Sequence, residues 1–348
     1  MAYTTINKST EHFNTVTYTG NGSTQNITGV GFQPDLVWAK RRSADGWHFW
    51  TDAVRGAGKA IYSNRNDAQF TDSDNSDINS FLTDGFSIGN NADINGNGQT
   101  QVAWNWKAGT GQGSSNTDGS INTTYTSVNT TAGFSISSFT GTGANATVGH
   151  GLGVAPKVII TKSLANAENW GFYHESLGNT KQLNINTTSA VTGASSAYYN
   201  NTSPTSTVFS VGTADATNDA ANMIAYCFAE KTGYSKFGSY TGNGSADGTF
   251  VYTGFKPAFV LLKRTDSDNW WHIFDNKRDE FNLTDKVLYP NKNNAEATAI
   301  LGDMLSNGFK LRQTDADVNG SSASYIYMAF AEEPLVANVG ASIPATAR

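Results

Sequence analysis

The stretch Tyr18-Thr19-Gly20-Asn21-Gly22 opens a pattern that occurs three times in the chain. It returns as Phe139-Thr140-Gly141-Thr142-Gly143 and as Tyr240-Thr241-Gly242-Asn243-Gly244, at spacings of 121 and 101 residues. A spacing near one hundred residues is too long for a solenoid repeat and matches the size of one domain. The repeat therefore predicts three copies of one fold.

Each copy continues in the same order after this opening. A proline precedes an apolar strand that ends on lysine, a tryptophan follows seven or eight residues later, and two further apolar strands close the unit. The repeated residues are Pro34, Pro156 and Pro257; Lys40, Lys162 and Lys263; Trp47, Trp170 and Trp270; Phe86, Phe209 and Phe309; and the closing runs 102–106, 224–228 and 326–330. This order predicts domains at 14–109, 120–230 and 236–334, followed by an extended C-terminal tail at 335–348.

The composition favours strands and turns over helices. The chain is 38% hydrophobic but only 15% charged, and Gly, Asn, Thr and Ser supply most of its polarity. These residues favour turns or disfavour helix interiors. We therefore predict an all-β protein of three tandem, related antiparallel β-sandwich domains of jelly-roll or lectin-like type. Six aromatic residues of the repeated strands are predicted to lie in the core: Trp38, Trp104, Tyr226, Phe86, Phe209 and Phe309.

Two segments depart from the strand pattern. Residues 295–306 are the best helix candidate, because Ala297, Ile300, Leu301 and Met304 fall at helical spacing; the alternative is a structured loop. The linker 109–119 is rich in Gly, Ser, Asn and Thr, a composition typical of a flexible connection.

Charge and cysteine content restrict the partners of this protein. The net charge is −6, whereas nucleic acids and anionic membranes call for a basic face, so neither is expected as a partner. The basic cluster Lys40-Arg41-Arg42 is interpreted as a solvated strand end. Membrane insertion is not expected, since no window approaches eighteen apolar residues, and no secretory signal is recognised. The single cysteine, Cys227, lies in an apolar run and is predicted to be a buried, inert thiol.

Several motifs together resemble a repeated domain of unknown function found in virion proteins of marine tailed bacteriophages. They are the Tyr-Thr-Gly-Asn-Gly-Ser opening at 18–23, the runs 31–40 and 149–157, the close at 104–109 and the start at 1–6. The resemblance covers nearly the whole chain, in three tandem copies of the domain. It implies a phage structural protein of tail-fibre or capsid-surface type, made in the host cytoplasm and exposed on the virion surface. It brings no catalytic residues with it.

One acidic residue recurs at a constant distance from the repeated tryptophan. Asp52, Glu175 and Asp275 each lie five residues after it, and Arg55 and Arg278 follow three residues later in the first and third units. One hypothesis is a general acid or base for glycan cleavage, which needs a second carboxylate within about 10 Å. The other is an Asp–Arg pair or turn cap that fixes a loop. The five histidines lie at unequal offsets from the tryptophans and do not predict one repeated site.

A second recurrence is an Asp-led turn just after the strand that contains the repeated phenylalanine of each unit. In the first unit the oxygen-bearing residues are Asp93, Asn95 and Asn97; in the third they are Asp315, Asp317 and Asn319; the second unit has Asp215. This spacing matches the first half of a calcium loop, but Trp104 and Ile326 stand where an EF-hand needs glutamate. An EF-hand is therefore excluded. A weak Ca²⁺ site of another type and a turn held by Asx side chains both remain open, and no other cofactor is expected.

These observations lead to three alternatives for function. The leading one is a non-enzymatic bacteriophage virion structural protein, namely a tail-fibre or receptor-binding protein that adheres to host-surface glycan. The second is a capsid decoration protein of cement or head-fibre type, and the third is a glycan depolymerase. Expected partners are other virion proteins and a host glycan, and a homo-oligomer is also open.

Overall fold

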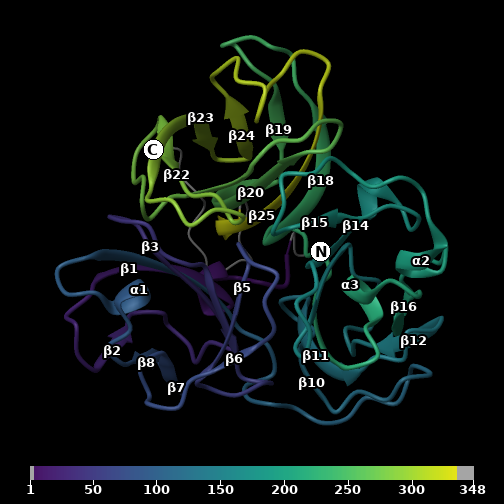
Figure 1. Ribbon diagram of the computed structural model, residues 1–348. Helices are drawn as coiled ribbons and strands as arrows, with labels where there is room; N and C mark the ends of the chain where they lie inside the picture. Colours follow the sequence, from purple (N-terminus) through teal and green to yellow (C-terminus); the bar gives the residue numbers. More distant parts are fainter. Residues whose placement is uncertain (1–3, 335–348) are drawn as a thin grey trace.

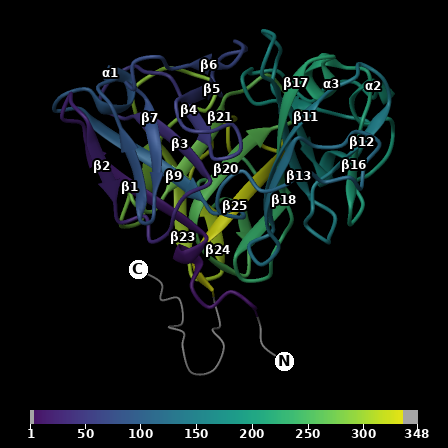
Figure 2. The same cartoon turned by 90° about the horizontal axis from the view of Figure 1, so that it is seen from below.

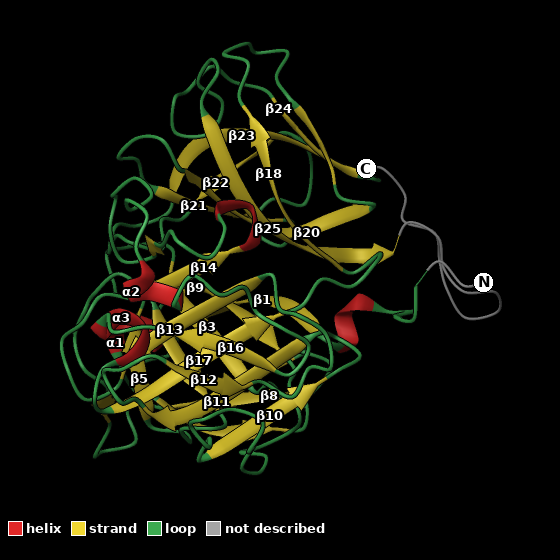
Figure 3. Cartoon of the chain, turned by 90° about the vertical axis from the view of Figure 1, so that its right-hand side faces the viewer, coloured by secondary structure: helices red, strands yellow, loops and turns green. Residues whose placement is uncertain are grey.

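The three repeated segments form three pairs of β-sheets that surround a common centre (Figure 1). The computed structural model describes residues 4–334. The predicted tail at 335–348 lies outside the described residues. Strands make up 42% of the chain and helix 5%, and the sheets are antiparallel, so the predicted all-β class is confirmed. The helices are single short turns in the connections outside the strands (Figure 3).

Unit 1 pairs a six-stranded sheet with a three-stranded one. The larger sheet has the order β1 (Phe13–Thr19), β9 (Thr100–Trp106), β3 (Leu36–Arg41), β4 (Phe49–Asp52), β5 (Lys59–Tyr62) and β6 (Phe70–Thr71). The smaller sheet has the order β2 (Gln25–Thr28), β8 (Gly85–Ile88) and β7 (Ile78–Leu82). The helical turns are η1 (Ser9–Glu11) and α1 (Ala92–Asn95).

Unit 2 repeats this plan with an additional edge strand, β10, which follows the linker, and without counterparts of β6 and β7. Its larger sheet has the order β10 (Tyr125–Asn129), β11 (Phe134–Thr140), β17 (Asn222–Phe228), β13 (Val158–Ser163), β14 (Gly171–His174) and β15 (Leu183–Asn184). The smaller sheet pairs β12 (Ala146–Gly149) with β16 (Val208–Val211). The helical turns are η2 (Glu175–Leu177), α2 (Ser196–Tyr199) and α3 (Asp215–Asn218).

Unit 3 consists of two four-stranded sheets. The inner sheet has the order β18 (Ser235–Thr241), β25 (Ser324–Pro334), β20 (Phe255–Arg264) and β21 (Trp271–Asp275). The outer sheet has the order β19 (Phe250–Tyr252), β24 (Gly308–Leu311), β23 (Ala297–Leu305) and β22 (Thr284–Val287). From below, β20 and β25 run between the inner sheets of the other two units (Figure 2).

The inner sheets are buried on both faces, which explains their continuous apolar runs. On β3, Val37 and Ala39 pack into the core of unit 1, while Leu36 and Trp38 pack into a second core shared by all three units. The inner strands of units 2 and 3 alternate in the same way between their own core and the shared one. Successive side chains on a strand point to opposite faces of the sheet. Every inner strand must therefore be apolar on both faces.

The shared core is centred on one aromatic residue from each unit. Trp106, Phe228 and Phe330 hold the same place on the closing strand of their units, as the pairing with β3, β13 and β20 shows. Their ring centroids lie 5.7 to 6.4 Å apart, so the three rings form a triangle. Such ring separations lie in the range that aromatic pairs prefer. The chain is thus a pseudo-three-fold ring, closed by its own core.

The six aromatic residues predicted to be core are all buried, with at most 2% of each exposed. Trp38, Trp104 and Tyr226 belong to the shared core, whereas the three phenylalanines belong to the cores of their own units. Cys227 is buried as well, so the predicted burial of this thiol is confirmed, and burial raises its pKa far above the ordinary value.

The predicted helix at 295–306 is wrong, since this segment forms strand β23. Ala297, Ala299 and Leu301 alternate toward the interior, and Ile300 is 37% exposed. The bend at Gly302, with φ of 142°, turns Met304 inward again and produced the false helical spacing. A Cβ at Gly302 would lie 1.9 Å from the Lys310 carbonyl oxygen, so this bend needs glycine.

The expectation of a flexible linker at 109–119 is also wrong. The carboxylate of Asp35 accepts hydrogen bonds from the backbone of Ala108, Thr110 and Gly111 at 2.7 to 3.0 Å. Ser114 then pairs with Thr126 at the edge of β10. The linker is fixed because a buried carboxylate of unit 1 takes up its free amide groups.

Candidate functional site

Unit 1 meets unit 2 through a buried ion pair. Asp52 Oδ2 accepts from Arg55 Nε at 2.5 Å and from the hydroxyl of Tyr226, in unit 2, at 2.7 Å. At most 2% of either charged side chain is exposed. Burial opposes the charge of the guanidinium, but Asp52 holds the pKa of Arg55 above its ordinary value. The guanidinium therefore remains charged inside the interface.

Unit 3 meets unit 1 through the same arrangement. Asp275 Oδ2 accepts from Arg278 Nε at 2.5 Å and from Trp104 Nε1, in unit 1, at 3.0 Å. Both charged side chains are fully buried. Trp104 occupies the place on the closing strand that Tyr226 holds in unit 2. The alternative of an Asp–Arg pair is thus confirmed in the first and third units, and both acids are sealed from solvent.

Unit 2 meets unit 3 through a different set of residues. The residue equivalent to Asp52 and Asp275 is His174, because all three pair with the same position of the neighbouring strand. His174 Nδ1 accepts from the Ser176 amide at 3.2 Å, which leaves Nε2 to donate to the Tyr327 carbonyl at 3.2 Å. Burial lowers the pKa of His174 to about 4, so the imidazole is neutral at pH 7.

The grouping of Glu175 with Asp52 and Asp275 is therefore wrong. Glu175 is exposed and binds Lys157 at 2.9 Å. The error comes from counting from tryptophan, since the register places Trp170 with His48 and Trp271 rather than with Trp47 and Trp270. A one-residue shift moves a strand residue to the other face.

A second ring of contacts connects each unit to the one before it. Trp170 Nε1 of unit 2 donates to the Tyr62 carbonyl of unit 1 at 3.1 Å, and Trp271 Nε1 of unit 3 donates to the Asn184 carbonyl of unit 2 at 3.2 Å. Each of these loops also carries an asparagine whose side-chain oxygen accepts from a backbone amide of its own unit. The pairs are Asn64 with His48, Asn186 with Trp170, and Asn291 with Trp271. Sequence reasoning missed these loops, although they repeat as Tyr62-Ser63-Asn64, Asn184-Ile185-Asn186 and Tyr289-Pro290-Asn291.

The repeated lysines Lys40, Lys162 and Lys263 are fully buried. Each Nζ donates to the carbonyl of the following residue at 2.6 to 2.7 Å. Burial lowers the pKa to about 7 for Lys40 and to about 8 for the other two. The interpretation of 40–42 as a solvated strand end is therefore wrong: Lys40 is buried, and Arg41 and Arg42 bind Asp93 and Glu296.

The Asp-led turns fasten the Thr-Gly turns at 18–22, 139–143 and 240–244. Asn95 Nδ2 donates to the Ser23 carbonyl at 2.6 Å, and its Oδ1 accepts from the Asn21 amide at 3.0 Å. Asn218 and Asn319 make the same two contacts in the other units. The approach is so close that a Cβ at Gly20 would lie 2.3 Å from the Gly96 carbonyl oxygen. This explains why each turn carries glycine after threonine.

The other predicted calcium ligands are spread over separate roles. Asp93 binds Arg41 at 3.0 Å, Asp315 accepts from the Asp317 amide at 2.8 Å, and Asp317 accepts from the side chain of Asn269. Asn97 is exposed. Within residues 4–334, no group of three or more His, Cys, Asp or Glu side chains is placed to hold a metal ion. The calcium site stays a prediction, with two of its amide oxygens already engaged by the backbone.

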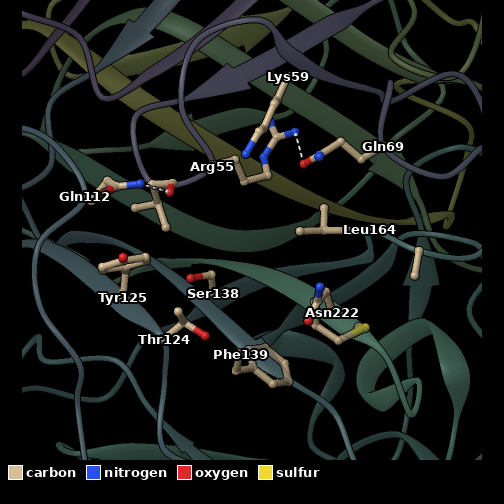
Figure 4. A pocket seen from close by; sticks show the side chains of 13 residues that line it. Arg55, Lys59, Gln69, Gln112, Thr124, Tyr125, Ser138, Phe139, Leu164 and Asn222 are labelled. Atoms are coloured by element: carbon tan, nitrogen blue, oxygen red, sulfur yellow. Dashed lines mark hydrogen bonds between the residues drawn. The ribbon is translucent and has the colours of Figure 1, made fainter. Parts of the chain in front are cut away.

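Two interfaces leave a groove open to solvent. The groove between units 1 and 2 has a volume of about 500 Å³, and the groove between units 2 and 3 has about 490 Å³. Corresponding residues line both grooves: Arg55 and Leu177, Lys59 and Lys181, Phe139 and Tyr240, Leu164 and Thr265, and Asn222 and Ser324. The first groove also has a wall from β10, where Tyr125 is 37% exposed (Figure 4).

A third hollow, of about 390 Å³, lies between units 1 and 3 and contains Trp47 and Trp270. Arg65 lies over the Trp47 ring at 4.4 Å, and Lys292 lies over the Trp270 ring at 3.3 Å. Cations at these distances are attracted to the ring faces. Because the chain's own cations cover them, these tryptophans are not free platforms for a ligand.

A family described as a domain of unknown function, DUF7483, matches residues 8–334. The chain belongs to this family. Comparison with curated proteins found no match, and comparison with solved structures found none either.

The DUF7483 match runs through all three units as one stretch. The family's domain is therefore the complete ring rather than one of its three repeats. This agrees with the shared core, in which every unit buries one face of its inner sheet against the other two. No helix within residues 4–334 is long and apolar enough to span a membrane.

Proposed function

We propose that this DUF7483 protein is a non-enzymatic structural protein of a bacteriophage virion, and that it adheres to host-surface glycan as a tail-fibre or receptor-binding protein. The observation that carries the proposal is the pair of open grooves at equivalent interfaces. The first is lined by neutral hydroxyl and amide side chains, by two cations and by an exposed tyrosine. Such a mixture suits the hydroxyl groups and apolar ring faces of a sugar.

The buried acids support the non-enzymatic part of the proposal. A glycosidase needs two carboxyl groups that flank the bond to be cleaved. Asp52 and Asp275 are fully buried, and each is held by an arginine and by an aromatic donor. The repeated acid therefore supports the assembly of the ring rather than glycan cleavage.

The test is binding of the purified protein to an array of bacterial surface glycans, combined with a reducing-sugar assay on every glycan that binds. We expect saturable binding and no release of reducing sugar. Release of reducing sugar would favour the depolymerase, and a lack of binding to any glycan would contradict the adhesive role.

The pseudo-three-fold ring favours one second candidate, a capsid decoration protein. A single chain with three similar units can seat on a three-fold axis where a trimer would otherwise bind. Five of the eight exposed large hydrophobic residues of the described chain lie in unit 3: Phe250, Tyr252, Phe281, Leu283 and Ile300. Such residues suit contact with another virion protein. Density for the ring on a three-fold axis of the capsid in a virion map would select this candidate, and density at the tail would select the adhesive role.

A further inference from the structure

The three interfaces place different side chains at one equivalent position. The backbone amides of Gln69, Val191 and Glu296 donate to the carbonyls of Leu164, Thr265 and Arg42, respectively, at 2.8 to 2.9 Å. Each donor comes from one unit and each acceptor from the next unit around the ring. The three donors are therefore equivalent, and the side chains that they carry can be compared directly.

At the interface between units 3 and 1, this position carries a carboxylate. Glu296 Oε2 accepts from Arg278 Nη1 at 3.0 Å and from Arg42 Nε at 2.9 Å, and Oε1 accepts from Arg42 Nη2 at 2.9 Å. Arg278 thus holds two carboxylates: Asp275 through Nε, and Glu296 through Nη1. The arrangement is charge-assisted on both sides of the guanidinium.

In the groove between units 1 and 2, the equivalent arginine has only the first of these carboxylates. Arg55 binds Asp52 through Nε, but its Nη1 reaches only the neutral Gln69 Oε1, at 3.4 Å. Lys59 lines the same groove, and the residues that line it include no aspartate or glutamate. Figure 4 shows Arg55, Lys59 and Gln69 together on one side of the groove, with Tyr125, Thr124 and Ser138 on the other.

We propose that the groove between units 1 and 2 binds the carboxylate of an acidic sugar, beside the position where Gln69 presents a neutral amide instead of the carboxylate of Glu296. Lys59 Nζ donates to the carboxylate, the guanidinium of Arg55 in the groove wall attracts it, and Tyr125 with the hydroxyls of Thr124 and Ser138 contacts the sugar ring. The proposal rests on the adhesive function and names its ligand class. It fits a chain of net charge −6 that nevertheless gathers cations and no acids at this groove.

The groove between units 2 and 3 provides an internal comparison. Leu177 takes the place of Arg55, Val191 takes the place of Gln69, and Asp266 takes the place of Ala165. A carboxylate here would meet an aspartate and no buried guanidinium, and like charges repel each other. This second groove should not bind an acidic sugar.

The test measures binding of hexamers of alginate and of polygalacturonate, each beside its carboxyl-reduced counterpart, by calorimetry. Gln69→Glu places a carboxylate beside Arg55, as Glu296 does beside Arg278. We expect it to abolish binding of the acidic hexamers while the melting temperature is maintained. Val191→Glu is the matched variant in the second groove and should leave binding unchanged. Lys59→Gln should weaken binding about tenfold, as loss of a charge-assisted hydrogen bond does, and Lys181→Gln should not.

Three results would overturn the inference: no binding of either acidic hexamer, equal binding of the carboxyl-reduced forms, or an equal loss from the variants of the two grooves. Equal binding of the reduced forms would leave the adhesive function standing and remove only the acidic ligand. Failure of the protein to bind any glycan on the array would remove the adhesive function itself. The two failures are therefore distinguishable.

Discussion

The interface between units 1 and 2 and the interface between units 2 and 3 are built on the same strands but held by opposite chemistry. The first has Asp52, Arg55 and the hydroxyl of Tyr226. The second has His174, Leu177 and Met328 at the equivalent positions. Where the acid is absent, its arginine and its aromatic donor are absent as well. A buried charge without its partners is strongly destabilising, so the three residues differ as a set.

The largest effect should come from the interface between units 3 and 1, through Trp104→Ala. The indole is fully buried in the shared core and donates to Asp275. We expect a loss of about 3–5 kcal/mol in the free energy of unfolding from the cavity, measured by urea denaturation. Phe70→Ala is the control, since Phe70 is 47% exposed and its truncation should cost less than about 0.5 kcal/mol. Equal costs would remove Trp104 from the core of the ring.

The next largest effect compares Asp275 with Glu175, the residue that lies at the same distance from the repeated tryptophan in unit 2. Asp275→Ala leaves the fully buried Arg278 with Glu296 as its remaining carboxylate partner and should cost about 3–5 kcal/mol. Glu175→Ala removes one exposed ion pair and should cost less than about 1 kcal/mol. Urea denaturation of the two variants provides the measurement. A large cost at Glu175 would restore the grouping of Asp52, Glu175 and Asp275 and contradict the register.

These two positions also show what the sequence could predict. The repeat, the strand class and the buried aromatics follow from local patterns, because turns and two-sided burial mark single segments. The ring does not follow, since Trp104 gives no sign in the sequence that its indole reaches Asp275 of another unit. The grooves could not be predicted for the same reason. Arg55 of unit 1 and Leu164 of unit 2 line the same groove only because the two units pack against each other. The one-residue shift at Trp170 was invisible without the register, as was the change of period that Gly302 causes in β23.

A smaller effect tests the donors that the two kinds of interface use. Tyr226→Phe removes the hydroxyl that donates to Asp52 and leaves the ring in place. The buried carboxylate then lacks one donor, which should cost about 1–3 kcal/mol. Met328→Leu at the equivalent position removes no hydrogen bond and should cost less than about 1.5 kcal/mol. If Tyr226→Phe proved neutral in thermal and urea denaturation, the hydroxyl would contribute nothing to the first interface.

The buried lysines are common to all three units and should add a pH dependence that the interfaces do not share. Their pKa values are lowered to about 7 or 8 in the folded protein, whereas an unfolded lysine has a pKa near 10.4. Between these values the unfolded chain binds more protons, so stability should rise as the pH rises from about 7 toward 10. Lys162→Met should flatten this rise in melting temperature, whereas Lys181→Met, at an exposed residue, should not. An unchanged slope in Lys162→Met would contradict the lowered pKa.

The smallest expected effect concerns the Asp-led turns. These turns are alike in all three units, whereas the interfaces differ from one another. In each, a buried asparagine already holds the Thr-Gly turn through its own oxygen and nitrogen. Calcium needs six to eight oxygen ligands, and the turn at 315 offers Asp315 and Asp317 with an amide that is already engaged. We therefore expect the same melting temperature with millimolar calcium and with excess chelator. A bound ion stabilises the folded state by mass action. A calcium-dependent rise that disappears in Asp315→Asn would establish the site, and would make unit 3 unlike its partners in the turns as well.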